Sequence, residues 1–206
     1  MNPSPPRRPL ALFEPAQVPG LLGRLRMDWL LAHFPPRLVW AAFMAINGFL
    51  SIALMSLAAL ASGTSFVFPS LGPTAFLFFF NPDAPSASPR HTIYGHAIGI
   101  LCGWGALWAT GLQHAQWHPG HAVMPARVLA AALALGATGA LMILLKAAHP
   151  PAGATTLIIA LGILVEPKQL VVIEFAVVLL TLQAIAINRL AGLDYPLWAR
   201  RTDPAP

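Results

Sequence analysis

Residues 149–156 read His-Pro-Pro-Ala-Gly-Ala-Thr-Thr and separate two apolar stretches of the chain. Two prolines followed by small residues predict an abrupt helix start, because proline fits the first helical turn and needs no N–H partner there. We expect the amides from Gly153 to Thr156 to be free and to point at whatever lies in front of the helix. The glycine would also let a ligand approach the backbone closely.

A related pattern occurs earlier, at residues 69–74, which read Pro-Ser-Leu-Gly-Pro-Thr. Both patterns follow P-x-x-G-x-T, and the aligned residues are Pro69 and Pro150, Gly72 and Gly153, and Thr74 and Thr155. The apolar stretches around them correspond as well, 38–61 with 126–147 and 91–112 with 169–190. The chain is therefore predicted to contain two three-segment repeats with short or broken helices at these motifs, an arrangement that marks binding sites in transporters.

The composition predicts an all-α polytopic membrane protein. The chain has 206 residues, of which 57% are hydrophobic and 9% are charged, whereas soluble domains carry about 25% charged residues. No Asp, Glu, Lys or Arg lies between Arg37 and Asp83. This window is longer than one crossing, which needs about 20 residues. We expect the chain to cross the bilayer at least four times.

The distribution of basic residues predicts the topology. They lie at the ends of apolar segments, at Arg7, Arg8, Arg24, Arg26 and Arg37 and then at Arg189, Arg200 and Arg201. By the positive-inside rule, both termini are expected in the cytoplasm and the protein in the inner membrane. If the two motif segments span, the repeats are inverted and the 113–124 loop, which has no Lys or Arg, faces outward. The alternative is four crossings with two re-entrant pieces.

The same charge pattern argues against nucleic-acid binding, despite a net charge of +5. Three regions are expected along the chain. The first region, 1–34, begins with a disordered tail at 1–20, and an amphipathic interfacial helix or an ordinary flanking segment follows at 21–33. A transmembrane domain covers 35–197, and a cytoplasmic tail covers 198–206. In the interfacial reading, Arg24, Arg26 and Asp28 face lipid headgroups.

The two motifs predict an anion site between two helix N-termini. Helix N-termini attract anions through free amides and the helix dipole. The residues expected to bind the substrate are His149, Gly153, Thr155, Thr156, Ser70, Gly72, Thr74, Lys146, Arg90, His96 and Asn47. Among them, His149 is expected to gate or to carry a proton, and Lys146 or Arg90 to attract charge. The alternatives are helix packing for the Pro/Gly motifs and for Asn47, headgroup contact for Lys146, and membrane anchoring for Arg90.

The run from His149 to Thr155 resembles the signature of the HPP family of integral membrane proteins. Shorter stretches that also resemble this family are Ser70-Leu71-Gly72-Pro73-Thr74-Ala75, Pro89-Arg90 with Gly95-His96, and Asn188-Arg189 with Tyr195-Pro196. The resemblance covers about residues 35–197. It implies a multi-helix membrane domain, and some cyanobacterial and plastid members of the family are associated with nitrite transport.

Other functions find less support in the sequence. His114, His118 and His121 have a spacing that could bind a metal, but Pro119 and Gly120 interrupt any helix there, so no metal site is predicted. No catalytic set and no cofactor motif is recognised, so the chain is not expected to be an enzyme. The leading expectation is transport of a small inorganic anion, with nitrite as the example, by a chain that could form a homodimer. The alternative is a non-transporting membrane scaffold or sensor.

Overall fold

The computed structural model is all-helical over the residues it describes, which are 21–64 and 67–200. The helices are α1 (Leu21–Arg24), α2 (Met27–His33), α3 (Pro36–Ser62), α4 (Leu71–Phe80), α5 (Pro89–Ala109), α6 (Pro125–Leu144), α7 (Ala152–Ala160) and α8 (Pro167–Leu190), with a 3-10 turn, η2, at Pro85–Ala87. The predicted disordered tail at 1–20 and the last residues, 201–206, lie outside the described part of the chain.

Three helices, α3, α6 and α8, are long and apolar enough to cross a membrane. The 21-residue helix α5 is of similar length but less apolar, because it carries Arg90, His91 and His96. Its polar residues are tolerated because α5 is enclosed by other helices, and it packs against α6, α7 and α8. Its buried face is continuous from Pro89 to Leu107.

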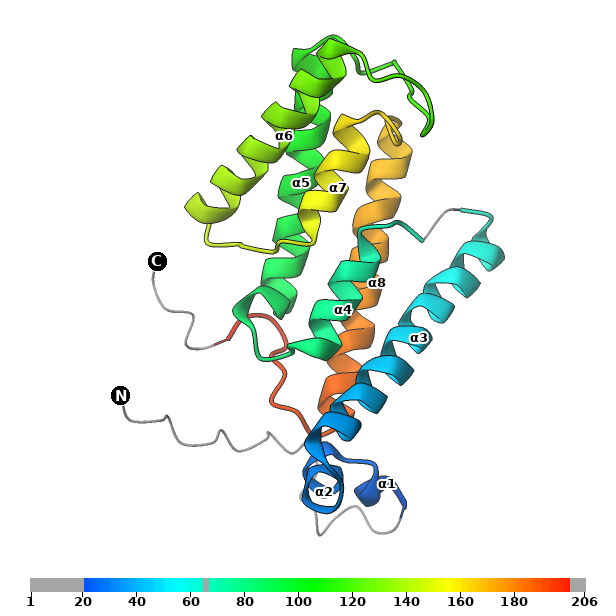
Figure 1. The fold of residues 1–206 in the computed structure, drawn as a ribbon, viewed down its shortest axis with the longest axis vertical. Coiled ribbons are helices and arrows are strands. Elements are labelled where there is room, and N and C mark those ends of the chain that lie inside the picture. The colour runs from blue at the N-terminus through cyan, green and yellow to red at the C-terminus, as the bar shows by residue number, and fades with distance from the viewer. Residues whose placement is uncertain (1–20, 65–66, 201–206) are drawn as a thin grey trace.

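The two motif segments form short helices. Helix α4 has 10 residues and α7 has 9, so at 1.5 Å per residue each covers about half of a hydrocarbon core roughly 30 Å thick. Successive helices from α3 to α8 alternate in direction, so α4 and α7 run oppositely (Figure 1). Both begin near the middle of the long axis of the molecule (Figure 1).

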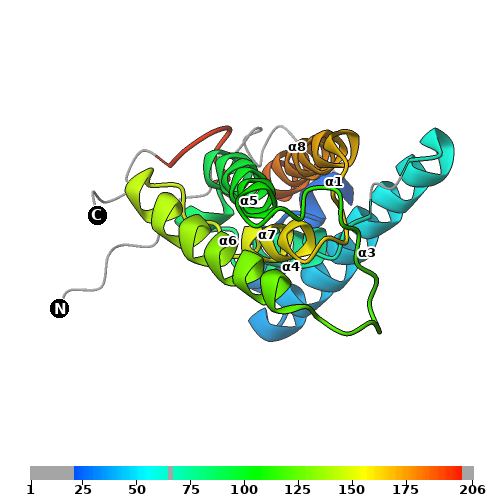
Figure 2. The same cartoon turned by 90° about the horizontal axis from the view of Figure 1, so that it is seen from above.

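The helices form two layers when viewed from above (Figure 2). Helices α5 and α8 lie side by side in one layer, and α4 and α7 lie in the other, flanked by α3 and α6. The apolar core between the layers includes Phe78, Phe79, Leu107 and Leu180, all 0% exposed. This packing fixes the starting points of α4 and α7 relative to α5.

The helix boundaries differ from the sequence prediction by a few residues, mostly because of proline. Each of the four long helices begins at a proline, Pro36, Pro89, Pro125 or Pro167, one or two residues earlier than expected, since proline is favoured in the first helical turn. The short helix expected to start at the 149–156 motif covers only Ala152–Ala160. It ends before Gly162, whose φ of 79° is a left-handed conformation that terminates a helix.

The expected amphipathic helix at 21–33 is two short helices. The chain bends between α1 and α2, and Arg26 is only 4% exposed. Its guanidinium lies 3.5 Å from the Asp28 carboxylate and against Gly192, just after α8. The backbone N–H of Met27 donates to Ala191. The prediction that Arg26 faces headgroups is therefore wrong, because this side chain packs against the end of α8.

Candidate functional site

Four side chains meet where the short helices begin, and we refer to them as the histidine–threonine cluster. Thr74 comes from the first turn of α4, His96 from α5, His149 from the segment before α7, and Thr155 from the first turn of α7. All four are 0% exposed. The fold therefore brings both motifs to one buried polar point.

His96 joins the two motifs. Its Nε2 lies 3.0 Å from Thr74 Oγ1, and its Nδ1 lies 2.8 Å from Thr155 Oγ1. These are the two threonines that align in the P-x-x-G-x-T patterns. Thr74 Oγ1 also lies 3.3 Å from His149 Nε2. The His96 and His149 rings are 5.0 Å apart between centroids, so one hydrogen-bonded chain runs through all four residues.

The direction of this chain follows from its fixed end. His149 Nδ1 lies 2.7 Å from the Ser86 carbonyl oxygen, which can only accept, so Nδ1 carries the proton and Nε2 of the neutral ring is an acceptor. The one proton of Thr74 Oγ1 can point to His149 Nε2 at 3.3 Å or to the Ser70 carbonyl at 3.0 Å. When it points to His149, Thr74 accepts from His96 Nε2. His96 Nδ1 in turn accepts from Thr155. With both rings neutral, this tautomer assignment places one proton in each of four contacts. They are Ser86–His149, His149–Thr74, Thr74–His96 and His96–Thr155.

Close packing of α5 on α7 keeps the cluster in register. Gly95, Gly99 and Gly103 are spaced four apart on α5, and all face the α7 region. A Cβ at Gly95 would lie 2.5 Å from the Cβ of His149, and one at Gly99 would lie 2.9 Å from the Ala152 carbonyl oxygen. Sequence reasoning missed this stripe, although its G-x-x-x-G spacing is a known signal for close helix contact in membranes.

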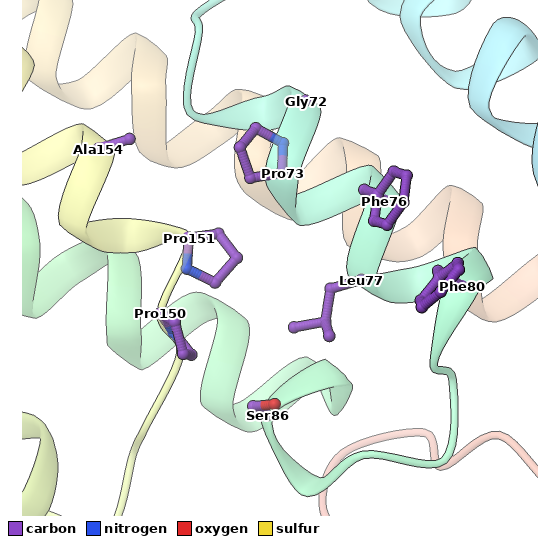
Figure 3. A pocket seen from close by; sticks show the side chains of 9 residues that line it. All are labelled: Gly72, Pro73, Phe76, Leu77, Phe80, Ser86, Pro150, Pro151 and Ala154. Carbon is purple, nitrogen blue, oxygen red and sulfur yellow. The ribbon is translucent and has the colours of Figure 1, made fainter.

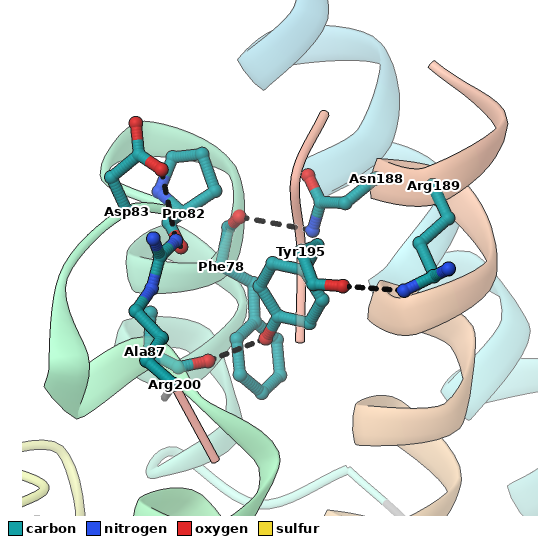
Figure 4. A network of polar contacts seen from close by, with 8 residues as sticks. All are labelled: Phe78, Pro82, Asp83, Ala87, Asn188, Arg189, Tyr195 and Arg200. Atoms are coloured by element: carbon teal, nitrogen blue, oxygen red, sulfur yellow. Dashed lines mark hydrogen bonds and ion pairs between the residues drawn. The ribbon is translucent and has the colours of Figure 1, made fainter. Parts of the chain in front are cut away.

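The loop that presents the Ser86 carbonyl is held by the C-terminal segment (Figure 4). The buried Tyr195 hydroxyl donates to the Ala87 carbonyl, beside Ser86. Burial raises the pKa of the Tyr195 phenol, so this donor stays protonated well into the alkaline range. Arg200 donates to the Pro82 carbonyl at 2.9 Å and pairs with Asp83 at the same distance.

A groove of about 860 Å³ opens beside the cluster (Figure 3). It is lined by Gly72, Pro73, Phe76, Leu77, Phe80, Ser86, Pro150, Pro151 and Ala154. The motif prolines thus face one another across it, but Ser86 is the one hydroxyl residue in this lining. The groove is mostly apolar, so the polar ligands of any anion must come from the cluster behind it.

The remaining motif residues surround the cluster. Thr156 bonds Thr138 of α6, with 3.0 Å between the hydroxyl oxygens. The carbonyl oxygen of the buried Ser70 lies 3.0 Å from Thr74 Oγ1, while the Ser70 hydroxyl has no hydrogen-bond partner among the described residues. Gly153 faces Leu135 of α6, and Gly72 lines the groove.

The predicted charged groups lie away from the cluster. The Arg90 guanidinium donates to the Lys146 carbonyl at 2.7 Å and to the Leu145 carbonyl at 3.4 Å, and thereby caps α6. The Lys146 side chain is exposed. Asn47, on α3, donates to the Phe43 carbonyl of its own helix. None of these three has a recorded bond to the cluster, so its four side chains carry the site.

Two of the amides expected to be free at the start of α7, those of Gly153 and Ala154, are hydrogen-bonded. The N–H groups of Ala152, Gly153 and Ala154 donate to the carbonyls of the three preceding residues, 149–151, at 3.0–3.1 Å. The two prolines fold the segment into tight turns that satisfy these donors internally. The expected backbone cradle at Gly153 is therefore wrong for this conformation, and side chains supply the polar groups instead.

Comparison with known proteins places the chain in a family. Residues 33–196 match the family model described as HPP, transmembrane region. The match runs from the last residue of α2 to just beyond Tyr195, so it includes both motifs and the segment that holds the Ser86 loop. No curated protein and no solved structure matches the chain.

Proposed function

This chain belongs to the HPP transmembrane-region family and is a membrane protein, and we propose that it carries a small inorganic anion, nitrite or a nitrite-like ion, across the membrane. The anion would bind at the histidine–threonine cluster, between the starts of α4 and α7. One observation carries the proposal. The equivalent threonines of two oppositely running short helices bond the two nitrogens of one imidazole, His96.

The packing of the helices supports an inverted repeat. If α3, α4 and α5 are exchanged for α6, α7 and α8, the neighbours are preserved. The pair α3 with α4 becomes α6 with α7, and α4 with α8 becomes α7 with α5. Likewise α3 with α8 becomes α6 with α5, while α5 and α8 pack on each other. This is the arrangement of transporters that bind substrate at the interface of two repeats.

The positions of the basic residues favour six crossings with both termini inside. Arg37 starts α3, Arg90 starts α5, and Arg189 ends α8, all at the same end of the helix bundle (Figure 1). The 113–124 loop, without Lys or Arg, lies at the other end. The bacterial inner membrane is the setting that this asymmetry predicts.

The cluster offers an anion several donors and no competing carboxylate. The hydroxyls of Thr74 and Thr155 and an N–H of His96 would turn from one another to the ion. The Ser70 hydroxyl, one helical turn before Thr74, is a buried donor that has no hydrogen-bond partner among the described residues. Leaving such a group unpaired costs about 1–3 kcal/mol, which a bound anion would recover.

Nitrite uptake into proteoliposomes tests this function. Thr74→Val and Thr155→Val remove a hydroxyl with little change in shape, and each is expected to reduce uptake at least tenfold, a loss of about 1.4 kcal/mol. Thr181→Val is the matched control, since Thr181 is also buried but bonds only the Val177 carbonyl of its own helix. If Thr74→Val and Thr155→Val both take up nitrite as fast as Thr181→Val does, the proposed site is refuted.

One observation favours a second candidate, a membrane scaffold or sensor. The cluster is sealed in this conformation, and the adjacent groove is apolar, so no hydrated path reaches His96 or His149. A scaffold would keep such a centre closed. Wild-type protein that passes none of a panel of small anions, while Thr74→Val unfolds more readily, would favour this candidate over transport.

A further inference from the structure

We propose that anion passage is coupled to a proton, that His149 carries this proton, and that the Thr74 hydroxyl switches direction to accommodate it. The inference rests on the anion transport proposed above. It starts from a feature of the cluster that an anion site alone does not explain. Thr74 Oγ1 has three partners at 3.0–3.3 Å, His96, His149 and the Ser70 carbonyl, but only one proton to give.

In the neutral cluster that proton points at His149 Nε2, because the contact between this nitrogen and Thr74 Oγ1 would otherwise join two acceptors. The cluster must first open to water, since it is sealed in this conformation. Hydronium then delivers a proton: an N–H bond forms at His149 Nε2, a water molecule is released, and the ring becomes an imidazolium. The Thr74 hydroxyl then rotates its own proton to the Ser70 carbonyl, 3.0 Å away. Its oxygen accepts from both His149 and His96, so every contact is still satisfied without movement of a heavy atom.

Protonation of His96 could not be offset by a hydroxyl rotation of this kind. Proton uptake at His96 Nδ1 would force the Thr155 hydroxyl to turn away. Among the described residues, Thr155 has no alternative acceptor, whereas Thr74 has one in Ser70. The two threonines align in sequence but differ in this respect, so the structure assigns the proton to His149.

The charge created at His149 has no counterion nearby. The titratable groups that face it are His91 and His96, both on α5. Helices α4 and α7 and turn η2 contain no Asp, Glu, Lys or Arg, and the nearest basic residues in sequence are Lys146, which is exposed, and Arg90, which caps α6. A buried imidazolium is costly unless it is paired, so protonation and binding of a monovalent anion each favour the other.

A monovalent anion that moves with one proton moves no net charge, and this distinguishes the coupled mechanism from simple anion passage. The full chain is reconstituted in vesicles that enclose a pH-sensitive dye, with nitrite as the probe and a potassium ionophore to set the membrane potential. Passive entry of nitrous acid is subtracted using protein-free vesicles. Wild-type uptake is expected to acidify the lumen and to be unchanged when the imposed potential is reversed.

Two contrary outcomes have different meanings. Uptake that follows the imposed potential without acidification overturns proton coupling but leaves anion transport standing. Uptake no greater than in protein-free vesicles overturns the anion transport itself and this inference with it. Thr74→Val has no hydroxyl to rotate, so its coupled flux is expected to be at least tenfold below that of the wild type. Coupled flux at the wild-type level in this variant overturns the switch.

A measurement without flux locates the proton. Protein with ¹⁵N-labelled histidine in lipid nanodiscs is expected to show a new imidazolium signal when nitrite is added. His149→Gln should remove that signal, while His91→Gln should retain it, because His91 also faces His149 but lies outside the cluster and bonds Ser88. Thermal unfolding is used to confirm that each variant is folded. Apparent nitrite affinity in the wild type should fall by up to about tenfold per unit rise in pH. A signal that persists in His149→Gln, or no signal in the wild type, overturns the assignment to His149.

Discussion

Substitution of Gly99 by alanine should loosen the contact between α5 and α7. The added Cβ would lie 2.8 Å from Thr156 Oγ1 and 2.9 Å from the Ala152 carbonyl oxygen. Ordinary contacts begin near 3.4 Å, so the helices must separate by about half an ångström, and overpacking of this kind costs about 1–3 kcal/mol. Alanine recovers up to about 1 kcal/mol of helix propensity, which leaves a net loss of about 1–2 kcal/mol.

Gly105→Ala is the matched control. Gly105 is on the same helix but is exposed, and a Cβ there meets nothing within 4 Å, so this variant should be as stable as the wild type or slightly more stable. Cys102, the sole cysteine and half-buried on α5, allows unfolding to be followed with a thiol-reactive dye. For a chain of this size, Gly99→Ala should lower the melting temperature by about 2–8 °C. Equal melting of the two variants would refute the close-packing argument.

Three further predictions concern the surroundings of the site. Gly162→Ala should cost about 2 kcal/mol or more in the same dye assay, because the residue has a φ of 79° and its Cβ would lie within 3 Å of the Arg127 guanidinium. Tyr195→Phe should cost about 1–3 kcal/mol at neutral pH through loss of its hydrogen bond. Because burial raises the pKa of Tyr195, wild-type stability should fall as pH rises above the ordinary phenol value of 10.0, and the variant should lose less in a pH series of melting curves. Arg90→Gln should cost about 1–2 kcal/mol by uncapping α6, whereas Lys146→Gln should leave the melting temperature unchanged and reduce only nitrite uptake at low ionic strength.

Much of the fold is readable from the sequence because the bilayer constrains it. Long apolar segments bounded by charges, such as the one after Arg37, must become helices when no water is present to satisfy the backbone. The prolines of the two motifs mark where the short helices begin, and α4 and α7 start within two residues of them. These features are local, and local chemistry is what a single sequence records best.

The candidate site was only partly predictable. Thr74, Thr155, His96 and His149 could each be nominated from motif positions, but their meeting at one point depends on packing across the whole bundle. The expectation of free amides at Gly153 and Ala154 was wrong because the residues before Gly153 fold into tight turns that use these donors. No local pattern reveals such competition between neighbouring backbone groups.

The role of Ser86 was invisible for a similar reason. Its contribution is a backbone carbonyl, which every residue possesses, so the sequence carries no mark of it. The loop that aims this carbonyl is held by Tyr195, more than 100 residues later in the chain. The glycine stripe on α5 did have a signal, its spacing of four, but that signal indicates a close contact without naming the partner helix.

The His96 imidazole, which bonds both Thr74 and Thr155, makes the centre of the molecule asymmetric. In the alignment of the two motifs, the position that corresponds to His96 is Val177, and the one that corresponds to His149 is Phe68. Each half of the matched set of helices therefore contributes one titratable ring that the other half lacks. In the proposed transport, an ion arriving from one face would meet different side chains from an ion arriving from the other. Such a device can rectify, with unequal rates in the two directions under equal driving force, even though its architecture is balanced.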